Sequence, residues 1–253
     1  MTDPQTALQQ ALGRLRSEGG SDNRLVVTRG PAWFVLRASR GATEARCIAA
    51  TQRLLGDQHR IPADGVVALR MADFAKPRGA RTLSRSVDIS TEEARADLAG
   101  VLLSWLEAVF GLDSSHATAV SLSLGDVPVF DNERLHQAIR VLASDRSPDA
   151  RQSVYRALLR AQLLLVVDEH GAPAPFGTLG GAHTYAVFTS VAEADLRDPR
   201  GLEMKLVHGW SIFPELSALT PGSLQINPGG RLGGELYRNE LESLARASGS
   251  YRR

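Results

Sequence analysis

The chain has 253 residues, of which 43% are hydrophobic, and its formal net charge is +1. This length and composition suffice for one large domain or two ordinary domains with buried cores, and we expect two domains. No apolar run reaches the roughly 18 residues of a membrane span, and residues 1–20 lack the basic-then-apolar order of a signal peptide. We therefore expect a cytoplasmic protein with no membrane partner.

The basic residues give little reason to expect nucleic-acid binding. Of the 29 basic residues only Lys76 and Lys205 are lysines, a bias that we attribute to codon composition. One basic cluster spans residues 70–85, but no nucleic-acid motif accompanies it, so a solvated loop is the favoured interpretation. We predict no nucleic-acid partner.

The N-terminal half has the pattern of a helix, an antiparallel meander and a second helix. Asp3-Pro4 is a helix start, and apolar residues at helical spacing predict a helix over 4–17. Short strand-like runs follow at 24–28, 33–38 and 44–49. Residues 50–88 have no assigned structure beyond short helical turns, and a capping box of Ser90 and Glu93 then predicts a helix that ends at Gly111. These elements define a domain over 1–118.

A polar segment predicts a linker over 119–131, and the second domain then covers 132–253. Helices are expected to start at Asp131 and at Ser147-Pro148, and strands are expected at 163–167, 184–188, 202–207 and 224–226. The run at 163–167 is apolar throughout, which is typical of a strand buried on both faces. Short helices are expected at 191–196 and 210–218, and strands that alternate with helices indicate a small α/β layer structure. The predicted fold class is α+β in two domains.

The stretch 223–242 reads as a strand, a glycine-rich turn and a closing helix. Such a turn can present free backbone N–H groups at the positive end of a helix, which suits a carboxylate or a phosphate. We expect Gly229 or Gly230 to have a positive φ angle and Gly234 to lie at the helix entry. A purely structural turn is the competing interpretation, because the motif of a phosphate loop is absent. The candidate ligand-binding residues are Asn227, Gly229, Gly230, Gly233, Gly234 and Glu235.

No catalytic or metal-binding signature accompanies this turn. Cys47 is the only cysteine, so no disulfide or thiolate-rich metal site can form, and its apolar neighbours favour a buried structural residue over a nucleophile. The six histidines never combine with a carboxylate at metal-ligand spacing, and Glu169-His170 are too close together to close a tetrahedral site. Ser190 lacks a nucleophile elbow and fits a helix cap. We predict no metal, no cofactor and no catalytic residue.

Several motifs of the second half, taken in order, resemble the bacterial SseB family over about residues 132–247. They are the apolar run 163–167, Tyr185 to Ser190 with its Phe-Thr-Ser, Ile226-Asn227-Pro228-Gly229, and the Gly234-Glu235-Leu236 helix. The resemblance implies an α/β module without an established enzyme activity.

The first half resembles, more weakly, the type III secretion chaperone and YbjN-like (TY-Chap) fold. The resemblance is carried by the order of elements and by Leu54-Leu55, His59-Arg60-Ile61 and Phe110-Gly111. It implies peptide binding and often dimerisation, with no catalytic residue to transfer.

The leading hypothesis is a non-catalytic, chaperone-like or adaptor-like protein that binds a protein or peptide segment, with the first domain as the chaperone-like part and a homodimer as its expected assembly. The alternative is a small-molecule or anion sensor that uses the glycine-rich turn. An enzyme ranks third, because no catalytic motif is present.

Overall fold

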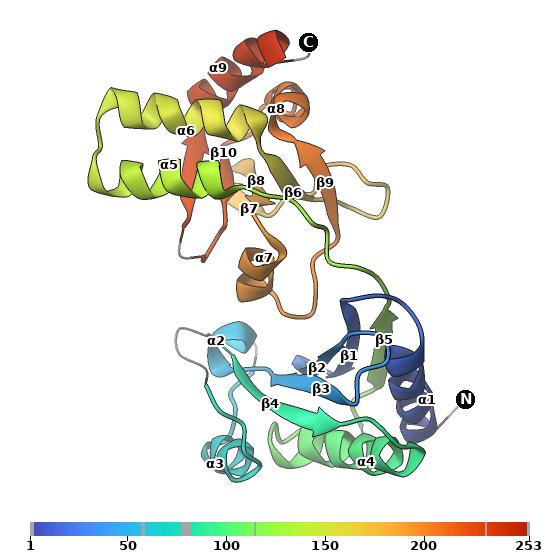
Figure 1. The fold of residues 1–253 in the computed structure, drawn as a ribbon. Coiled ribbons are helices and arrows are strands. Elements are labelled where there is room, and N and C mark those ends of the chain that lie inside the picture. The colour runs from blue at the N-terminus through green and yellow to red at the C-terminus, as the bar shows by residue number, and fades with distance from the viewer. Residues whose placement is uncertain (1–2, 57–58, 77–81, 114, 231, 252–253) are drawn as a thin grey trace. The chain divides into compact units, whose positions relative to one another are not determined.

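The computed structural model describes residues 3–56, 59–76, 82–113, 115–230 and 232–251 (Figure 1). The chain folds into two compact units, Met1–Val127 and Pro128–Arg253. Each unit combines helices with one sheet in which antiparallel pairing predominates, which confirms the α+β fold class. Within these described ranges, no helix is both long enough and apolar enough to cross a membrane.

The first unit is a five-stranded antiparallel sheet with helices on it. Its strands lie in the order β4-β3-β2-β1-β5, so the predicted three-strand meander gains one strand at each edge. The elements in chain order are α1 (Pro4–Ser17), β1 (Asn23–Arg29), β2 (Ala32–Ala38), β3 (Glu44–Ala49), α2 (Gln52–Leu55), α3 (Ala63–Met71), β4 (Leu83–Asp88), α4 (Glu92–Ala108) and β5 (Thr118–Ser123).

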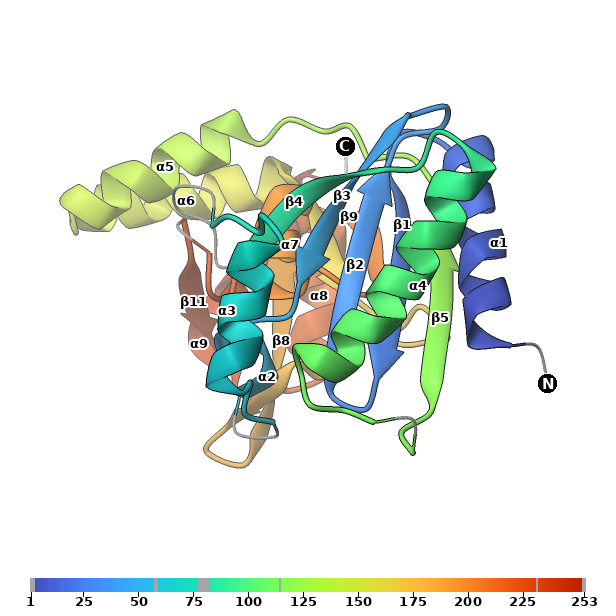
Figure 2. The same cartoon turned by 90° about the horizontal axis from the view of Figure 1, so that it is seen from below.

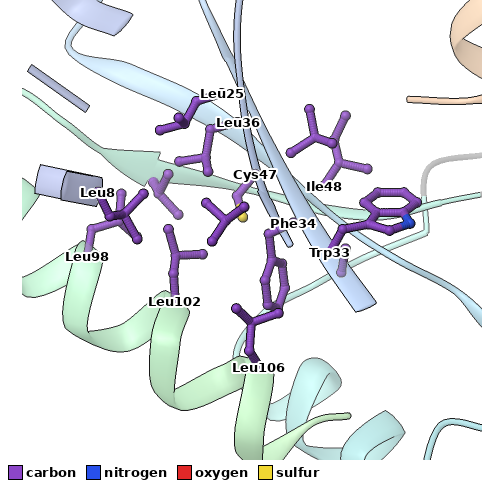
Figure 3. Close-up of a cluster of buried hydrophobic side chains, with 14 of the residues drawn as sticks. Leu8, Leu25, Trp33, Phe34, Leu36, Cys47, Ile48, Leu98, Leu102 and Leu106 are labelled. Carbon is purple, nitrogen blue, oxygen red and sulfur yellow. The ribbon is translucent and has the colours of Figure 1, made fainter. Parts of the chain in front are cut away.

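Helices α1 and α4 cover one face of this sheet (Figure 2). Leu98, Leu102 and Leu106 recur along α4 at intervals of four residues, as an amphipathic helix requires, and all are buried. Figure 3 shows these leucines packed with Phe34 and Cys47 of the sheet. Burial of this apolar surface is the main stabilisation of the unit.

An aromatic cluster extends this core at the far end of α4. Trp105 lies 5.4 Å from Phe74 and 5.8 Å from Phe34 between ring centroids, and the Arg85 guanidinium lies over the Trp105 ring at 5.5 Å. Tilted and edge-on rings at these separations are favourable aromatic geometry. The sequence of residues 50–88 showed no clear pattern, and within that range this cluster anchors Phe74, which follows α3, to α4.

The predicted start of α4 is wrong by one residue. Thr91 is the N-cap, since its hydroxyl accepts the Ala94 N–H at 3.1 Å. Ser90 lies one residue before the cap, and its own N–H donates to the Asp88 carboxylate at 2.7 Å. Both residues carry a hydroxyl that suits an N-cap, so the local sequence does not distinguish them.

The predicted linker over 119–131 begins too early. Thr118–Ser123 is strand β5, which pairs with β1 from Arg29↔Thr118 to Arg24↔Ser123. Beyond it, the Gly125 carbonyl accepts the Asp22 N–H at 3.0 Å and the Asp126 carboxylate accepts the Ser21 N–H at 2.9 Å. Because only one face of this edge strand is partly buried, its sequence is polar enough to resemble a loop.

The second unit contains a six-stranded mixed sheet. Five strands follow the order β11-β10-β8-β6-β9, and β7 pairs with β8. Strands β8 and β10 are parallel to each other. The elements are α5 (Glu133–Ser144), α6 (Pro148–Arg160), β6 (Gln162–Val166), β7 (Gly177–Leu179), β8 (Ala182–Phe188), α7 (Val191–Arg197), β9 (Met204–His208), α8 (Gly209–Ala218), β10 (Ser223–Ile226), β11 (Gly234–Tyr237), α9 (Arg238–Ser248) and a 3-10 turn (Gly249–Tyr251).

Both faces of this second sheet are covered. Leu163 and Leu165 of β6 join the larger apolar cluster beneath α5, α6, α8 and α9, whereas Leu164 and Val166 join a smaller cluster beneath α7 (Figure 1). The prediction that residues 163–167 are buried on both faces is therefore confirmed. The two strands that neighbour β6, which are β8 and β9, nevertheless run antiparallel to β6. An uninterrupted apolar run therefore does not require parallel pairing.

We expect limited subtilisin digestion to cut first within residues 128–131 and to release two folded fragments. Val129 is 96% exposed, and exposed connections between compact units are preferred sites of proteolysis. Mass spectrometry of the first fragments checks this. A first cut inside either unit, with the bonds around Val129 intact, would contradict the assignment.

We further expect Cys47 to resist alkylation by iodoacetamide until the protein is denatured. The side chain is fully buried, and burial raises the pKa of its thiol to about 12, so the reactive thiolate does not form near neutral pH. A raised pKa in the folded state stabilises the protein below pH 9, and that contribution disappears as the pH rises from 9.0 towards 12. The stability advantage of the wild type over Cys47→Ala should shrink over that interval, and native labelling at pH 7 would refute the structural role.

Candidate functional site

The glycine-rich stretch forms a hairpin loop between β10 and β11. All six candidate residues line a shallow depression of about 420 Å³ together with Gln225, Ile226 and Pro228. Gly229 has φ 78°, which confirms the predicted positive angle, and Asn227 also lies in the left-handed region at φ 47°.

The predicted helix entry at Gly234 is wrong. Gly234 is the first residue of β11, which pairs antiparallel with β10, and α9 begins only at Arg238. The start of α9 is already capped, because Glu240 Oε2 accepts the Tyr237 N–H at 2.9 Å. The loop therefore lacks the positive helix end on which the anion hypothesis rested. The apolar spacing from Leu236 onward could not reveal that four residues of strand precede the helix.

The charges around this loop also disfavour a simple anion site. The Glu235 carboxylate lines the depression and accepts a hydrogen bond from the Ser223 hydroxyl at 2.5 Å. A carboxylate repels a bound phosphate or carboxylate unless a cation intervenes. Ligand binding by the six residues thus remains a prediction without its original physical basis.

Asn227 faces inward, where it joins the ends of the parallel strands β8 and β10. Its Oδ1 accepts the Thr189 N–H at 2.8 Å, and its Nδ2 donates to Thr189 Oγ1 at 2.9 Å and to the Leu232 carbonyl at 2.7 Å. Thr189 and Asn227 are 1% and 0% exposed. Since buried polar groups must be paired, these bonds fix the loop and the strand ends in one arrangement.

Two residues of the α5 region extend this buried network, and sequence reasoning missed both. Asn132 Nδ2 donates to the Gln162 carbonyl at 2.6 Å and the Thr189 carbonyl at 2.9 Å, and His136 Nε2 lies 2.8 Å from Thr189 Oγ1. They lie more than 50 positions from Thr189 in the sequence, so no local motif could connect them. The network positions the first turn of α5 over the sheet.

A second polar contact ties α6 to α9. The Tyr155 hydroxyl donates to Glu240 Oε1, and Arg151 Nη1 lies 3.6 Å from the same oxygen. Burial, together with this hydrogen bond to a carboxylate, raises the pKa of Tyr155 to about 12. The tyrosine therefore stays a hydrogen-bond donor throughout the physiological range.

A larger and more enclosed depression lies between α5 and α6. These helices run side by side and are joined by a short connection (Figure 1), and α6 packs in turn on α8 and α9. The depression, which we call the hairpin groove, has a volume of about 680 Å³. Its lining consists of Asp131, Asn132, Arg134, Leu135, Gln137, Ala138, Val141, Ser153, Arg156, Ala157, Arg160 and Ala161.

The lining residues follow from helical spacing. On α5 the residues at 134, 138 and 141 share one face, and on α6 those at 153, 157 and 160 do the same. The small side chains of Ala138, Ala157 and Ala161 form the floor of the groove and leave it open. Val141 adds apolar surface and is 40% exposed. The result is an apolar trough between two polar banks.

Both banks carry positive charge. Arg134 stands on α5, and Arg156 and Arg160 stand on α6, against a single lining carboxylate, Asp131. Arg160 lies over the Tyr251 ring at 5.6 Å. Across the part of the chain that the structure describes, Arg134 and Arg156 have no ion-pair or hydrogen-bond partner. Two unpaired guanidinium groups therefore flank exposed apolar surface.

The other residues considered for chemistry have structural roles or none. Ser190 Oγ accepts the Glu193 N–H at 3.2 Å, which confirms the helix cap. Glu169 and His170 are exposed and lie 3.6 Å apart. Over the ranges that the structure describes, no three His, Cys, Asp or Glu side chains come together as a metal site.

The second unit is thus a mixed-sheet α+β domain whose helical hairpin carries an apolar groove with basic banks. Residues 135–243 match the family model of the SseB protein N-terminal domain, so the similarity lies within the C-terminal half of the chain. The match does not extend into the first unit, whose TY-Chap resemblance remains a prediction. No curated protein and no solved structure matches the chain.

Removal of the Asn227 amide should destabilise the second unit by about 1–3 kcal/mol, since it leaves the buried Thr189 N–H without an acceptor. Asn227→Gly is the informative variant, because glycine tolerates the left-handed backbone and so isolates the lost hydrogen bonds. Urea unfolding of Asn227→Gly, Asn227→Ala and the wild type measures both effects. Equal stability of the glycine variant and the wild type would show that the network contributes nothing net.

Proposed function

We propose that this protein is a non-catalytic cytoplasmic binding protein, and that its hairpin groove holds an acidic amphipathic helix of a partner protein. The observation that carries the proposal is the combination of an open apolar floor with the unpaired Arg134 and Arg156 on opposite banks. The SseB family match gives the domain but no activity.

The dimensions of the groove favour a helical occupant. The helical lining residues span 134–141 on α5 and 153–160 on α6, so the groove runs for about 12 Å along the helices, or a little over two turns. An amphipathic helix laid in such a trough buries residues at i, i+3, i+4 and i+7 and keeps its flanks at the banks.

The arginines of the groove determine which side chains should flank the apolar stripe of the bound helix. Arginine binds carboxylates in a planar, two-point arrangement and is weakly hydrated, which makes it suitable at partly buried interfaces. Glutamate or aspartate on both sides of an apolar stripe would pair with Arg134, Arg156 and Arg160. Repulsion would disfavour a basic helix of the same shape.

This proposal places partner binding in the C-terminal unit, whereas the sequence suggested the N-terminal unit. The alternative function, a small-molecule sensor at the glycine-rich loop, is supported by the depression of about 420 Å³ that its six residues line. It ranks second because the carboxylate of Glu235 and the absence of a helix end at this described loop weaken any attraction for anions.

The test uses a fluorescein-labelled peptide of about 14 residues with leucines along one helical face and glutamates on both flanks, beside a twin in which every glutamate is lysine. Fluorescence anisotropy should detect saturable binding of the acidic peptide only. Arg134→Glu and Arg156→Glu should each weaken binding at least about tenfold, which corresponds to roughly 1.4 kcal/mol.

Arg146→Glu is the matched control. Arg146 is exposed on the same helical hairpin but does not line the groove, and its substitution makes the same change in net charge. Equal binding of both peptides, equal losses in all three variants, or no binding of the acidic peptide at about 1 mM would each overturn the proposal.

A further inference from the structure

The first unit contains a second basic depression, independent of the hairpin groove. It lies along α1 and α4, which pack against each other (Figure 2), and has a volume of about 510 Å³. Its lining is polar and consists of Gln10, Gly13, Arg14, Arg16, Ser17 and Arg95. Three of these six residues are arginines, and none is acidic.

The three arginines differ in how far they are already neutralised. Arg14 is committed to Glu18, since its Nη2 lies 3.0 Å from Glu18 Oε2. Arg95 Nη1 donates to the Ile89 carbonyl at 3.0 Å, a neutral acceptor that holds the side chain in place and leaves its charge unbalanced. Arg95 is thus a positively charged side chain that a neutral acceptor holds in place.

Arg16 is the least satisfied of the three. It is only partly exposed, and its Nε is shut off from water without a hydrogen-bond acceptor. No ion pair or hydrogen bond of its guanidinium is present within the described ranges. The Nε itself is closed to a ligand as it is to water, but Arg16 lines the depression and its guanidinium charge has no counter-charge there, which favours an oxyanion beside it.

Gln10 adds an uncharged donor to the lining, whereas the Ser17 hydroxyl already donates to the Gly13 carbonyl at 2.9 Å. Gln10 and Ser17 lie on α1 to either side of Gly13, and nothing lies within 4 Å of where a Gly13 side chain would start. The open position at Gly13 leaves room for a ligand between Gln10 and the arginines. Glu92 is the first residue of α4. Its side chain and Arg95 line an adjoining depression of about 330 Å³.

We propose that this depression binds a phosphate group, with Arg16 and Arg95 as its charged ligands and Gln10 as a neutral donor. Tetrahedral oxyanions accept several hydrogen bonds at once, and a fork of guanidinium donors matches their geometry better than ammonium groups do. The size of the depression suits free phosphate or the phosphate of a small metabolite.

Isothermal titration calorimetry with the 253-residue protein tests the site, with inorganic phosphate, glycerol 3-phosphate and chloride as the probes. We expect saturable binding of at least one phosphate probe with a dissociation constant below about 1 mM, and none of chloride. Preference for glycerol 3-phosphate over inorganic phosphate would identify an organic phosphate as the natural ligand class, and the reverse would identify the free ion.

The variants separate a built site from general positive charge. Arg16→Gln should weaken binding at least about tenfold, and Arg16→Lys should also weaken it because the charge stays while the two-point fork is lost. Arg53→Gln is the control, since Arg53 is an exposed arginine of the same unit outside the depression. Circular dichroism melts check that each variant is folded. If Arg16→Gln does not fold, Arg16→Lys takes its place in the binding comparison.

Two results would overturn the proposal. One is the absence of saturable phosphate binding by the wild type. The other is an equal loss of affinity in Arg16→Gln and Arg53→Gln, which would reflect diffuse charge. Neither result bears on the hairpin groove, because the peptide assay uses residues of the other unit.

Discussion

The pair of hydrogen bonds between the Asn227 side chain and Thr189 is the constraint on which the second unit depends. Thr189 follows β8 and Asn227 follows β10, so the amide links the ends of the only two parallel strands in that sheet as the structure describes it. Through His136 and Asn132 the same bonds reach the first turn of α5. Loss of this network would release the loop, the strand ends and one bank of the groove together, because these buried polar groups have no ready substitute partners.

The two proposed sites have one physical feature in common. In each, two helices cover a sheet through their apolar faces, and the valley between their outer faces carries arginines that the protein does not neutralise. The hairpin groove has an alanine floor and therefore favours an amphipathic chain, whereas the depression along α1 and α4 has glutamine and serine and favours a compact anion. Positive charge alone would not distinguish the two ligands. The neutral residues between the arginines determine which ligand each site favours.

Strong local signals made much of the fold predictable from the sequence. Three of the predicted helix starts are capped by the expected side chains, which are those of Asp3, Ser147 and Ser190. A cap depends on only a few consecutive residues, so it can be recognised in the sequence. The strands with continuous apolar runs were also found. Edge strands β4, β5 and β11 were missed, since a half-exposed strand or one of four residues has too little apolar pattern to stand out. The groove was unpredictable for a different reason: its residues are ordinary surface positions of two helices, and only the packing of α5 on α6 gives them a common role.

The strand order has a consequence for synthesis of the chain on the ribosome. In the first unit the last strand, β5, adds to an edge, and that unit is complete in sequence by Val127. In the second unit β10 lies in the interior of the sheet between β8 and β11, although it follows β6, β7, β8 and β9 in the sequence. Until residues 223–226 emerge, β8 exposes an unpaired edge that could pair with other nascent chains. The first unit can therefore fold while translation continues, whereas the second unit must wait for residues 223–226 before its sheet can close.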